Sequence, residues 1–381
     1  MELLHWFALK EVPGIGNLLY KRLMDLFPSP SAVFDANPND LTSIRGISHK
    51  LAETIVNHRP TESCRRNLEQ TLDAGLTILT LKSASYPQIL KEIPDPPPIL
   101  HVAGTLNPDD AALAVVGSRK ATPYGKGNAM HLAGALSSMG YTIVSGLARG
   151  IDTTAHEAAI EAGGRTIAVM GCGLGSIYPS ENKRLAHTIS KRGAVISEWP
   201  HDTPPEAHHF PLRNRIISGL SLGVVVVEAS LKSGSLITAR CASEQNREVF
   251  ALPGPVRATQ SAGPHRLIQQ GAKLVTSPSD ITDELTPLTH KKPEQEEIPF
   301  NINTLKNNTD KSPPPSCHFL LDHEESSVLK VLDLYPSHID DILQHVPMDA
   351  GRLSAVLLSL ELKGVVERSP GKLFSLKEEK S

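Results

Sequence analysis

Cysteine is scarce in this 381-residue chain, and its placement excludes two common ways of stabilising a fold. Cys64, Cys172, Cys241 and Cys317 lie far apart and form no Cys-x-x-Cys pair. This pattern excludes a disulfide framework and a thiolate zinc site. We therefore expect reduced thiols in a cytosolic protein.

Long apolar runs are also missing. No run approaches the ~18 residues that a membrane-spanning helix needs. The first residues lack the basic and apolar regions of a signal peptide. From the sequence we therefore expect a cytoplasmic protein that does not enter a membrane.

Neither sign of charge is in marked excess, because 38 Lys and Arg stand against 41 Asp and Glu. A polyanion would therefore have to be bound by a local patch. Residues 110–285 hold 17 basic and 14 acidic side chains, whereas residues 318–381 hold 7 and 11. The centre of the chain is the segment whose charge favours a polyanion. Aromatic residues, at 4% of the chain, are too few for a continuous base-stacking platform.

Proline marks the predicted boundaries. The stretch "IPDPPPIL", residues 93–100, excludes a helix and favours an extended crossing. Residues 286–317 are rich in Pro, Asn, Lys and Glu without apolar periodicity, which is typical of a flexible linker. We predict a helical domain over 1–92, a central domain over 93–285, the linker over 286–317 and a last domain over 318–381.

The first segment contains two similar pieces, "VPGIGNLLYKRLMDLF" and "SIRGISHKLAETIVNH". Each has an apolar turn around a glycine, Gly14 or Gly46, followed by a helical pattern. This resembles tandem helix-hairpin-helix motifs, whose turn amides can face a phosphate at a helix N-terminus. The alternative is a packing domain whose glycines only permit tight turns, since Ser48 stands in the second copy where the first has Gly16.

The central segment alternates strand and helix patterns. Seven β-branched runs, "LAVV", "YTIV", "TIAVM", "GAVIS", "VVVV", "EVFAL" and "AKLVT", indicate strands buried on both faces. We predict an α/β fold, a doubly wound parallel sheet wrapped by helices. The last segment shows three amphipathic helical periods and then two strands around Pro370-Gly371, which is the plan of a winged helix.

Ligands of an open parallel sheet bind outside the carboxyl ends of its strands. Small, hydroxyl and basic residues follow the predicted strands there: Gly117, Ser118, Arg119, Ser145, Gly146, Gly171, Ser233, Gly234 and Ser235. Before the fifth strand, "FPLRNRIISGL" adds Arg213, Asn214 and Arg215, whose forked donors suit phosphate oxygens. The alternative is that these arginines pair with Glu198 and Glu228 in a structural network.

Enzymatic patterns fail one by one. "GLSLG" around Ser221 matches Gly-x-Ser-x-Gly, but it lies between a helix and a strand, in the wrong order for a nucleophile elbow. "HEAAI" at His156 lacks the second histidine of a zinc site. The glycines of "GCGLG" do not match the dinucleotide fingerprint. We predict no catalytic residue, no cofactor and no metal.

Six segments together resemble the DNA processing protein A family (DprA, also called Smf): "AVVGSRKATPYG", "IVSGLARGIDTTAH", "TIAVMGCGLGSIYPSENKRL", "FPLRNRIISGL", "VVVVEASLKSGSLITARCA" and "VFALPG". They cover residues 110–285 almost without gaps. The resemblance implies an extended Rossmann-like domain that forms a homodimer. It also implies a protein that binds and protects single-stranded DNA and loads the RecA recombinase onto it, as in natural transformation.

The resemblance also implies which residues form the DNA site. Besides the Gly117–Arg119 turn, residues 213–215 and residues 233–235, it adds Asn182, Lys183 and Arg184 of "YPSENKR". An enzymatic alternative is a nucleotide phosphoribohydrolase or nucleotide sensor of the LOG type, which shares this Rossmann variant. The recognition helix of the winged helix offers only Arg352 and Lys363 among acidic neighbours, so we predict a protein-contact or regulatory role in preference to duplex reading.

Overall fold

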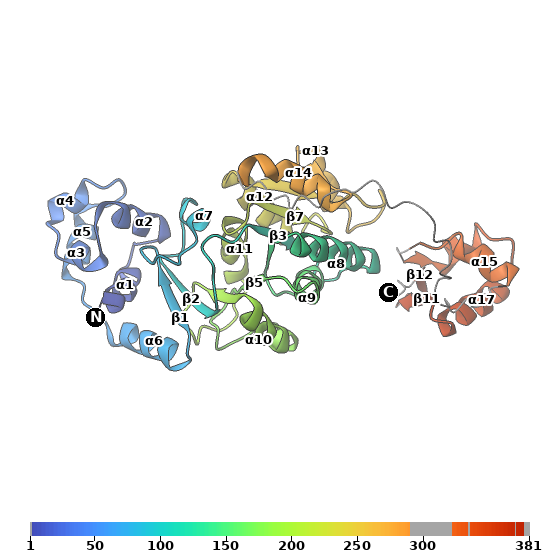
Figure 1. Ribbon diagram of the computed structural model, residues 1–381, viewed down its shortest axis with the longest axis horizontal. Helices are drawn as coiled ribbons and strands as arrows, with labels where there is room; N and C mark the ends of the chain where they lie inside the picture. The colour runs from blue at the N-terminus through green and yellow to red at the C-terminus, as the bar shows by residue number, and fades with distance from the viewer. Residues whose placement is uncertain (1, 290–321, 334–335, 370, 377–381) are drawn as a thin grey trace, which may run out of the picture. The chain divides into compact units, whose positions relative to one another are not determined.

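The computed structural model describes residues 2–289, 322–333, 336–369 and 371–376 (Figure 1). The described residues fall into two compact units, one within Met1–Ala121 and Asn128–Glu284, the other within Thr122–Gly127 and Leu285–Ser381. Most of the predicted linker, residues 290–317, lies outside the described residues. No helix in the described ranges has both the length and the apolar character needed to cross a membrane.

The N-terminal part of the first unit is helical, as predicted. Its helices are α1 (Glu2–Glu11), α2 (Asn17–Leu26), α3 (Pro30–Phe34), α4 (Pro38–Thr42), α5 (His49–Asn57) and α6 (Glu62–Asp73). Gly14 and Gly46 both have positive φ, +97° and +101°, in the turns before α2 and α5. The Ser48 side chain accepts the Leu51 amide and caps α5, and Gly16 stands at the same position before α2. The two copies therefore share one backbone design.

The central sheet has nine strands in the order β1-β2-β6-β5-β4-β3-β7-β8-β9. All seven predicted strands are present and parallel to one another: β3 (Ala112–Val116), β4 (Thr142–Ser145), β5 (Thr166–Val169), β6 (Ala194–Ser197), β7 (Gly223–Val226), β8 (Glu248–Ala251) and β9 (Lys273–Leu274). Two strands that the sequence did not predict, β1 (Thr77–Thr80) and β2 (Ile99–Gly104), add antiparallel pairs at the β6 edge. The sheet thus begins before the proline-rich stretch.

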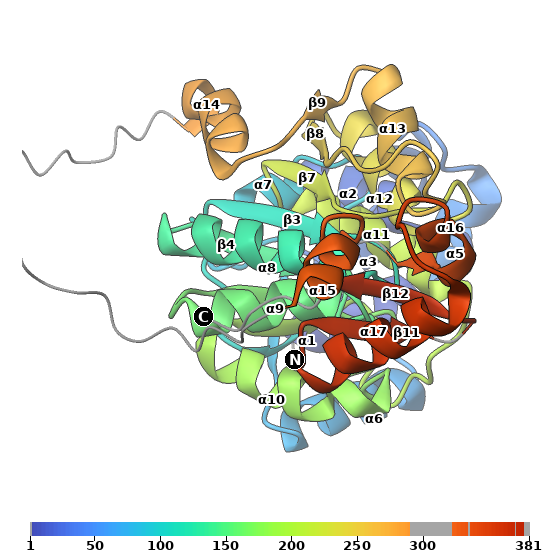
Figure 2. The ribbon, with the colours of Figure 1, turned by 90° about the vertical axis from the view of Figure 1, so that its right-hand side faces the viewer.

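The helices cover both faces of this sheet. Because β3 to β6 follow one another toward one edge, right-handed crossovers put α8 (Pro123–Ser138), α9 (Ile151–Glu161) and α10 (Lys183–Arg192) on one face. Figure 2 shows these three helices one below another. The chain then returns across β3, which puts α11 (His209–Gly219), α12 (Ser235–Glu244) and α13 (Ala262–Gln269) on the other face (Figure 1). Short α7 (Gln88–Lys91), a 3₁₀ turn at Ser180–Asn182 and α14 (Pro278–Thr289) complete the order.

One apolar core runs through the helical part and the sheet of the first unit. It extends from Trp6 through Tyr86 and Ile93 to Val224 and Ala242. Tyr86 is fully buried, and its hydroxyl donates to Pro97 O at 2.8 Å inside the stretch that was predicted to separate two domains. The N-terminal helices therefore pack on the sheet domain. The exact domain boundaries stay a prediction.

The second unit has the predicted winged-helix plan. Its elements are α15 (His323–Leu329), β10 (Ser337–His338), α16 (Ile339–Leu343), α17 (Ala350–Leu362), β11 (Val366–Ser369) and β12 (Leu373–Leu376), with strand order β10-β12-β11. Leu353, Leu357 and Leu360 of α17 are fully buried against Val328 of α15. The helical period predicted the amphipathic α17, and the sequence predicted β11 and β12, whereas β10 is a third strand that it did not predict.

The two hairpin glycines lead to a stability test. Gly46→Ala should lower the free energy of unfolding by about 1 kcal/mol, because a β-carbon is strained at positive φ and would lie 2.9 Å from Leu19 Cδ2. Gly16→Ser is the control, since Gly16 has φ −87° and open space around it. We expect the control to be neutral or to gain a few tenths of a kcal/mol. Equal urea midpoints for the two variants would contradict this account of the turns.

Candidate nucleic-acid interface

A cavity of about 480 Å³ opens outside the carboxyl ends of β3 and β7. This is the point where the strand order reverses, the usual ligand position in a doubly wound sheet. Three segments line most of it, Val116–Lys120, Phe210–Asn214 without Leu212, and Lys232–Ser235. Four basic residues and one acidic residue line the cavity: Arg119, Lys120, Arg213, Lys232 and Asp152. The imbalance favours an anionic ligand.

The turn after β3 is held tightly so that its arginine points outward. A β-carbon on Gly117 would lie 2.6 Å from Ile151 Cγ1 and 2.9 Å from Glu228 O, so only glycine fits there. Ser118 is buried, and its carbonyl accepts the Ile151 amide at the start of α9. Arg119 is exposed and forms no ion pair within the described part of the chain. Its charge is therefore available to a ligand.

Arg213 is different, because its guanidinium is buried at the ends of two strands. Nη1 donates to Gly146 O, after β4, at 2.8 Å and also to Val169 O of β5. Burial lowers the pKa of Arg213 to about 10, so the side chain stays charged at neutral pH. A β-carbon on Gly146 would lie 2.5 Å from Nη2, which explains the glycine there. Arg213 thus holds the rim together and still faces the cavity.

Asp152 is the one carboxylate of the cavity. Its Oδ2 accepts the amides of Gly146 at 3.1 Å and Ala148 at 3.4 Å, so it fixes the turn after β4. Burial raises the pKa of Asp152, while Arg213 and the backbone donors act in the opposite direction. These donors occupy the carboxylate, which gives Asp152 a structural role.

The sequence reading missed an aromatic contribution to this site. The guanidinium carbons of Arg119 and Arg213 lie 5.6 and 6.0 Å from the Phe210 ring centroid. Tyr178, which is 40% exposed, lies 5.7 Å from the same ring between centroids. Both rings line a smaller adjoining pocket with Arg149. The sequence signal for this contact was the spacing of three residues between Phe210 and Arg213, which makes them neighbours on one face of a helix.

The Ser233–Ser235 loop forms the opposite wall, as the sequence predicted. Ser233 Oγ and Ser235 Oγ lie 2.8 Å apart, and Asn214 Nδ2 donates to Gly234 O at 3.2 Å. Ser235 begins the ten-residue helix α12, so the positive end of the helix dipole lies at this wall. A helix N-terminus of this kind favours an anion.

Several predicted site residues lie elsewhere. Ser145 and Asn182 are buried and bonded to Val115 O and Leu147 O, because their side chains tie neighbouring loops together. A β-carbon on Gly171 would lie 2.8 Å from Phe210 Cδ1, so the glycine leaves room for the Phe210 ring. Lys183 and Arg184 are exposed on α10 and do not line the cavity.

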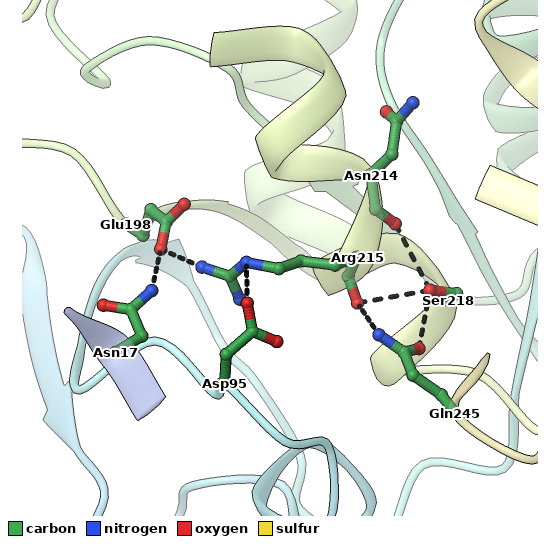
Figure 3. Close-up of polar contacts among 7 residues, drawn as sticks. All are labelled: Asn17, Asp95, Glu198, Asn214, Arg215, Ser218 and Gln245. Carbon is green, nitrogen blue, oxygen red and sulfur yellow. Dashed lines mark hydrogen bonds and ion pairs between the residues drawn. The ribbon is translucent and has the colours of Figure 1, made fainter. Parts of the chain in front are cut away.

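Arg215 also departs from the predicted site. Its Nε lies 3.2 Å from Asp95 Oδ2, and its Nη2 forms an ion pair with Glu198 (Figure 3). Arg215 does not line the cavity. The pairing with Glu198 is the one that the structural alternative described, and a half-turn of helix separates Arg215 from the cavity side of α11.

The patterns that failed as catalytic motifs have structural roles. Ser221 is buried and donates to Ile217 O at 2.9 Å. His156 is buried and bonded to Thr166 Oγ1, and burial lowers its pKa to about 3. Glu206, His208 and His209 bring potential ligand atoms within 4.8 Å of one another, a cluster that the sequence did not predict. Two of the three side chains are exposed, and such groups are common without a metal.

The two basic residues of the recognition helix are both held in ion pairs. Arg352 pairs with Glu324 at 2.7 Å, and Lys363 pairs with Glu325 at 2.6 Å. These are the two basic residues that a duplex-reading helix would have used. Exposed Leu358 and Leu362 lie on the same helix. The predicted protein-contact role stays a prediction.

The fold and the cavity define a doubly wound α/β protein with a basic cavity at its switch point, carrying helix-hairpin-helix and winged-helix extensions. A sequence profile described as DNA recombination-mediator protein A matches residues 77–286. The DprA winged helix domain profile matches residues 310–372, and the SAM-like helix-hairpin-helix tandem profile matches residues 8–58. The chain therefore belongs to the DprA/Smf family.

Individual relatives agree with this assignment. Protein Smf of Synechocystis is 36% identical over 97% of this chain and 98% of its own length. DNA processing protein DprA of Bacillus subtilis is 48% identical over 56% of this chain and 72% of its own. The crystal structure of DNA processing protein A from Streptococcus pneumoniae superposes with a TM-score of 0.63 at 36% identity, covering 74% of this chain and 99% of that one.

The structure of the Helicobacter pylori protein is also similar. It superposes with a TM-score of 0.51 at 32% identity and covers 56% of this chain and 98% of its own. That structure was determined to describe how the Helicobacter protein binds single-stranded DNA.

The two cavity arginines should respond differently to truncation. Arg213→Ala should lower the free energy of unfolding by about 3 kcal/mol, because two buried carbonyls lose a charged donor. Arg119→Ala should change it by less than about 0.5 kcal/mol, since the side chain is exposed. Urea unfolding of the two variants beside the unmodified chain measures both values. Equal losses would mean that Arg119 is also structural.

Proposed function

We propose that this chain binds single-stranded DNA through its phosphates in the switch-point cavity. The observation that carries the proposal is the meeting of Arg119 and Arg213 over one aromatic ring, from two segments 94 positions apart in the sequence. Guanidinium groups and lysines suit a row of diester phosphates. The Helicobacter relative, whose structure concerns single-stranded DNA binding, supports the same ligand.

The cavity also suits a strand more than a duplex. Phe210 and Tyr178 lie beside the arginines, so an unpaired base can stack on them while its phosphate contacts Arg119. A paired base has no free face for such stacking. Because two rings supply little hydrogen-bond readout, the contacts select for single strands without selecting a sequence.

We also propose that the protein acts as a mediator and catalyses no reaction. None of the described cavity residues is a histidine or a cysteine, and Asp152 already accepts two backbone amides. The profile named for a recombination mediator supports delivery of the bound strand to RecA, and the family resemblance implies a homodimer. RecA nucleation on single-stranded DNA, measured with and without this protein, tests the delivery step.

Phosphoribohydrolase activity of the LOG type is the competing function, and Asp152 is the carboxylate among the described residues that line the cavity. Incubation with nucleoside monophosphates distinguishes the two functions. If free base is released, and this release is lost in Asp152→Asn but retained in Arg65→Ala, the enzymatic function replaces the proposed binding function.

Arg119 supplies the direct test of the DNA site. Arg119→Ala should weaken binding of single-stranded DNA similarly for all sequences. The slope of log affinity against log salt should fall by roughly 0.7, the value for one neutralised phosphate on a single strand. Arg65→Ala, an exposed arginine on α6, is the matched control and should leave the slope unchanged. An unchanged slope in Arg119→Ala would remove that residue from the site.

Base selectivity gives a second measurement. Affinities for unstructured mixed sequences of equal length should agree within about tenfold, or ~1.4 kcal/mol. The physical reason is that backbone phosphates supply most of the contacts. A larger spread among such oligonucleotides at one salt concentration would show that base edges are read.

A further inference from the structure

Helix α11 has contacts on two opposite sides. Arg213 and Asn214 line the cavity, whereas Arg215 faces the N-terminal helices. Successive residues of a helix are rotated by about 100°, so positions 213 and 215 are about 200° apart. A single turn of helix therefore carries both the proposed DNA donors and the contact to another part of the fold.

The contact on the second side is a buried ion network (Figure 3). The side chains of Arg215 and Glu198 are 10% and 8% exposed, and Asp95 adds a second carboxylate to Arg215. Asn17 Nδ2, at the start of α2, donates to Glu198 Oε2 at 3.2 Å. Lys10 Nζ, near the end of α1, donates to Glu198 O at 2.7 Å. Both helices thus reach α11 through one glutamate.

The backbone of the same turn is tied to α12. Gln245 Nε2 donates to Arg215 O at 3.0 Å, and Ser218 Oγ donates to Gln245 Oε1 at 2.7 Å (Figure 3). The other end of α12 begins with Ser235 of the cavity wall. The α11 turn is therefore fixed between the N-terminal helices and the helix that carries the opposite wall of the site.

A purely stabilising role explains this network poorly. Arg215 Nη1 is buried without a hydrogen-bond partner among the described residues. Buried ion pairs with unsatisfied donors stabilise less than well-packed apolar residues would, and their best-attested use is to specify one arrangement. The arrangement specified here is the placement of α11 against α1 and α2.

We propose that Arg215 is a positioning residue, through which docking of the N-terminal helices sets the placement of Arg213 and Asn214 in the DNA cavity. The inference rests on the proposed binding of single-stranded DNA. Arg215 itself contacts no phosphate. Disturbing the network from the N-terminal side, far from the cavity, should therefore weaken DNA binding.

Asn17→Asp is the variant that tests this without altering α11. It puts a second carboxylate against Glu198, so we expect single-stranded DNA affinity to fall about fivefold with the salt slope unchanged. Asn39→Asp adds the same charge at an exposed position on α4 and should bind like the unmodified chain. Arg215→Gln should lose about tenfold in affinity, and Arg215→Lys should recover part of it. If Arg215→Gln does not fold, Asn17→Asp alone decides.

A second readout separates positioning from stability. Coupling between two sites is reciprocal, so bound DNA must in turn favour the docked N-terminal helices. Amide hydrogen exchange in residues 9–20 should slow when a dT oligonucleotide binds the full chain, and this protection should be lost in Asn17→Asp. A network that only stabilises the fold would show no such dependence on DNA.

The outcomes distinguish the two proposals. If the unmodified chain binds no single-stranded DNA at low salt, the proposed function fails. If the unmodified chain binds DNA, two results would contradict the positioning role of Arg215. One is that Asn17→Asp binds DNA equally well, and the other is that amide exchange in residues 9–20 does not change when DNA binds. A salt slope that falls by roughly 0.7 in Arg215→Gln would instead make Arg215 a phosphate ligand.

Discussion

The return of the chain from β6 across β3 to β7 is the constraint on which the site depends. Right-handed crossovers put α11 on the face opposite α9 and α10, and they start it at the edge where β2 and the N-terminal helices pack. The strand order reverses between β3 and β7, which leaves the crevice that α11 borders. Because one helix has to span from that edge to the crevice, it contacts both.

Within this frame, the two arginines of the helix are held in different ways. Arg213 donates to backbone carbonyls at the ends of β4 and β5, and Asp152, the carboxylate that interacts with it, already accepts two backbone amides. Arg215 is paired directly with two carboxylates. The two arginines therefore differ in their hydrogen-bond acceptors, carbonyl oxygens for Arg213 and carboxylates for Arg215.

The same distinction between paired and unpaired charges applies to the winged helix and the N-terminal helices. The winged helix pairs its recognition-helix cations with Glu324 and Glu325, whereas Arg119 of the central domain faces the switch-point cavity without an ion pair among the described residues. The N-terminal helices share an apolar core with the sheet and reach Glu198 with polar side chains. These contacts make the helix-hairpin-helix part a structural neighbour of the proposed DNA site.

The sequence by itself determined the fold class and all seven parallel strands, because these depend on local periodicity. It also determined the two hairpin glycines, which have positive φ, and the Arg119 turn, where a β-carbon on Gly117 would lie 2.6 Å from Ile151 Cγ1. Tertiary structure decided the rest. Strands β1 and β2 depend on pairing at a sheet edge, and Phe210 and Tyr178 meet only after folding. Arg213 and Arg215 read as one motif in the sequence, yet the 100° rotation per residue of a helix sends one to the cavity and the other to Glu198.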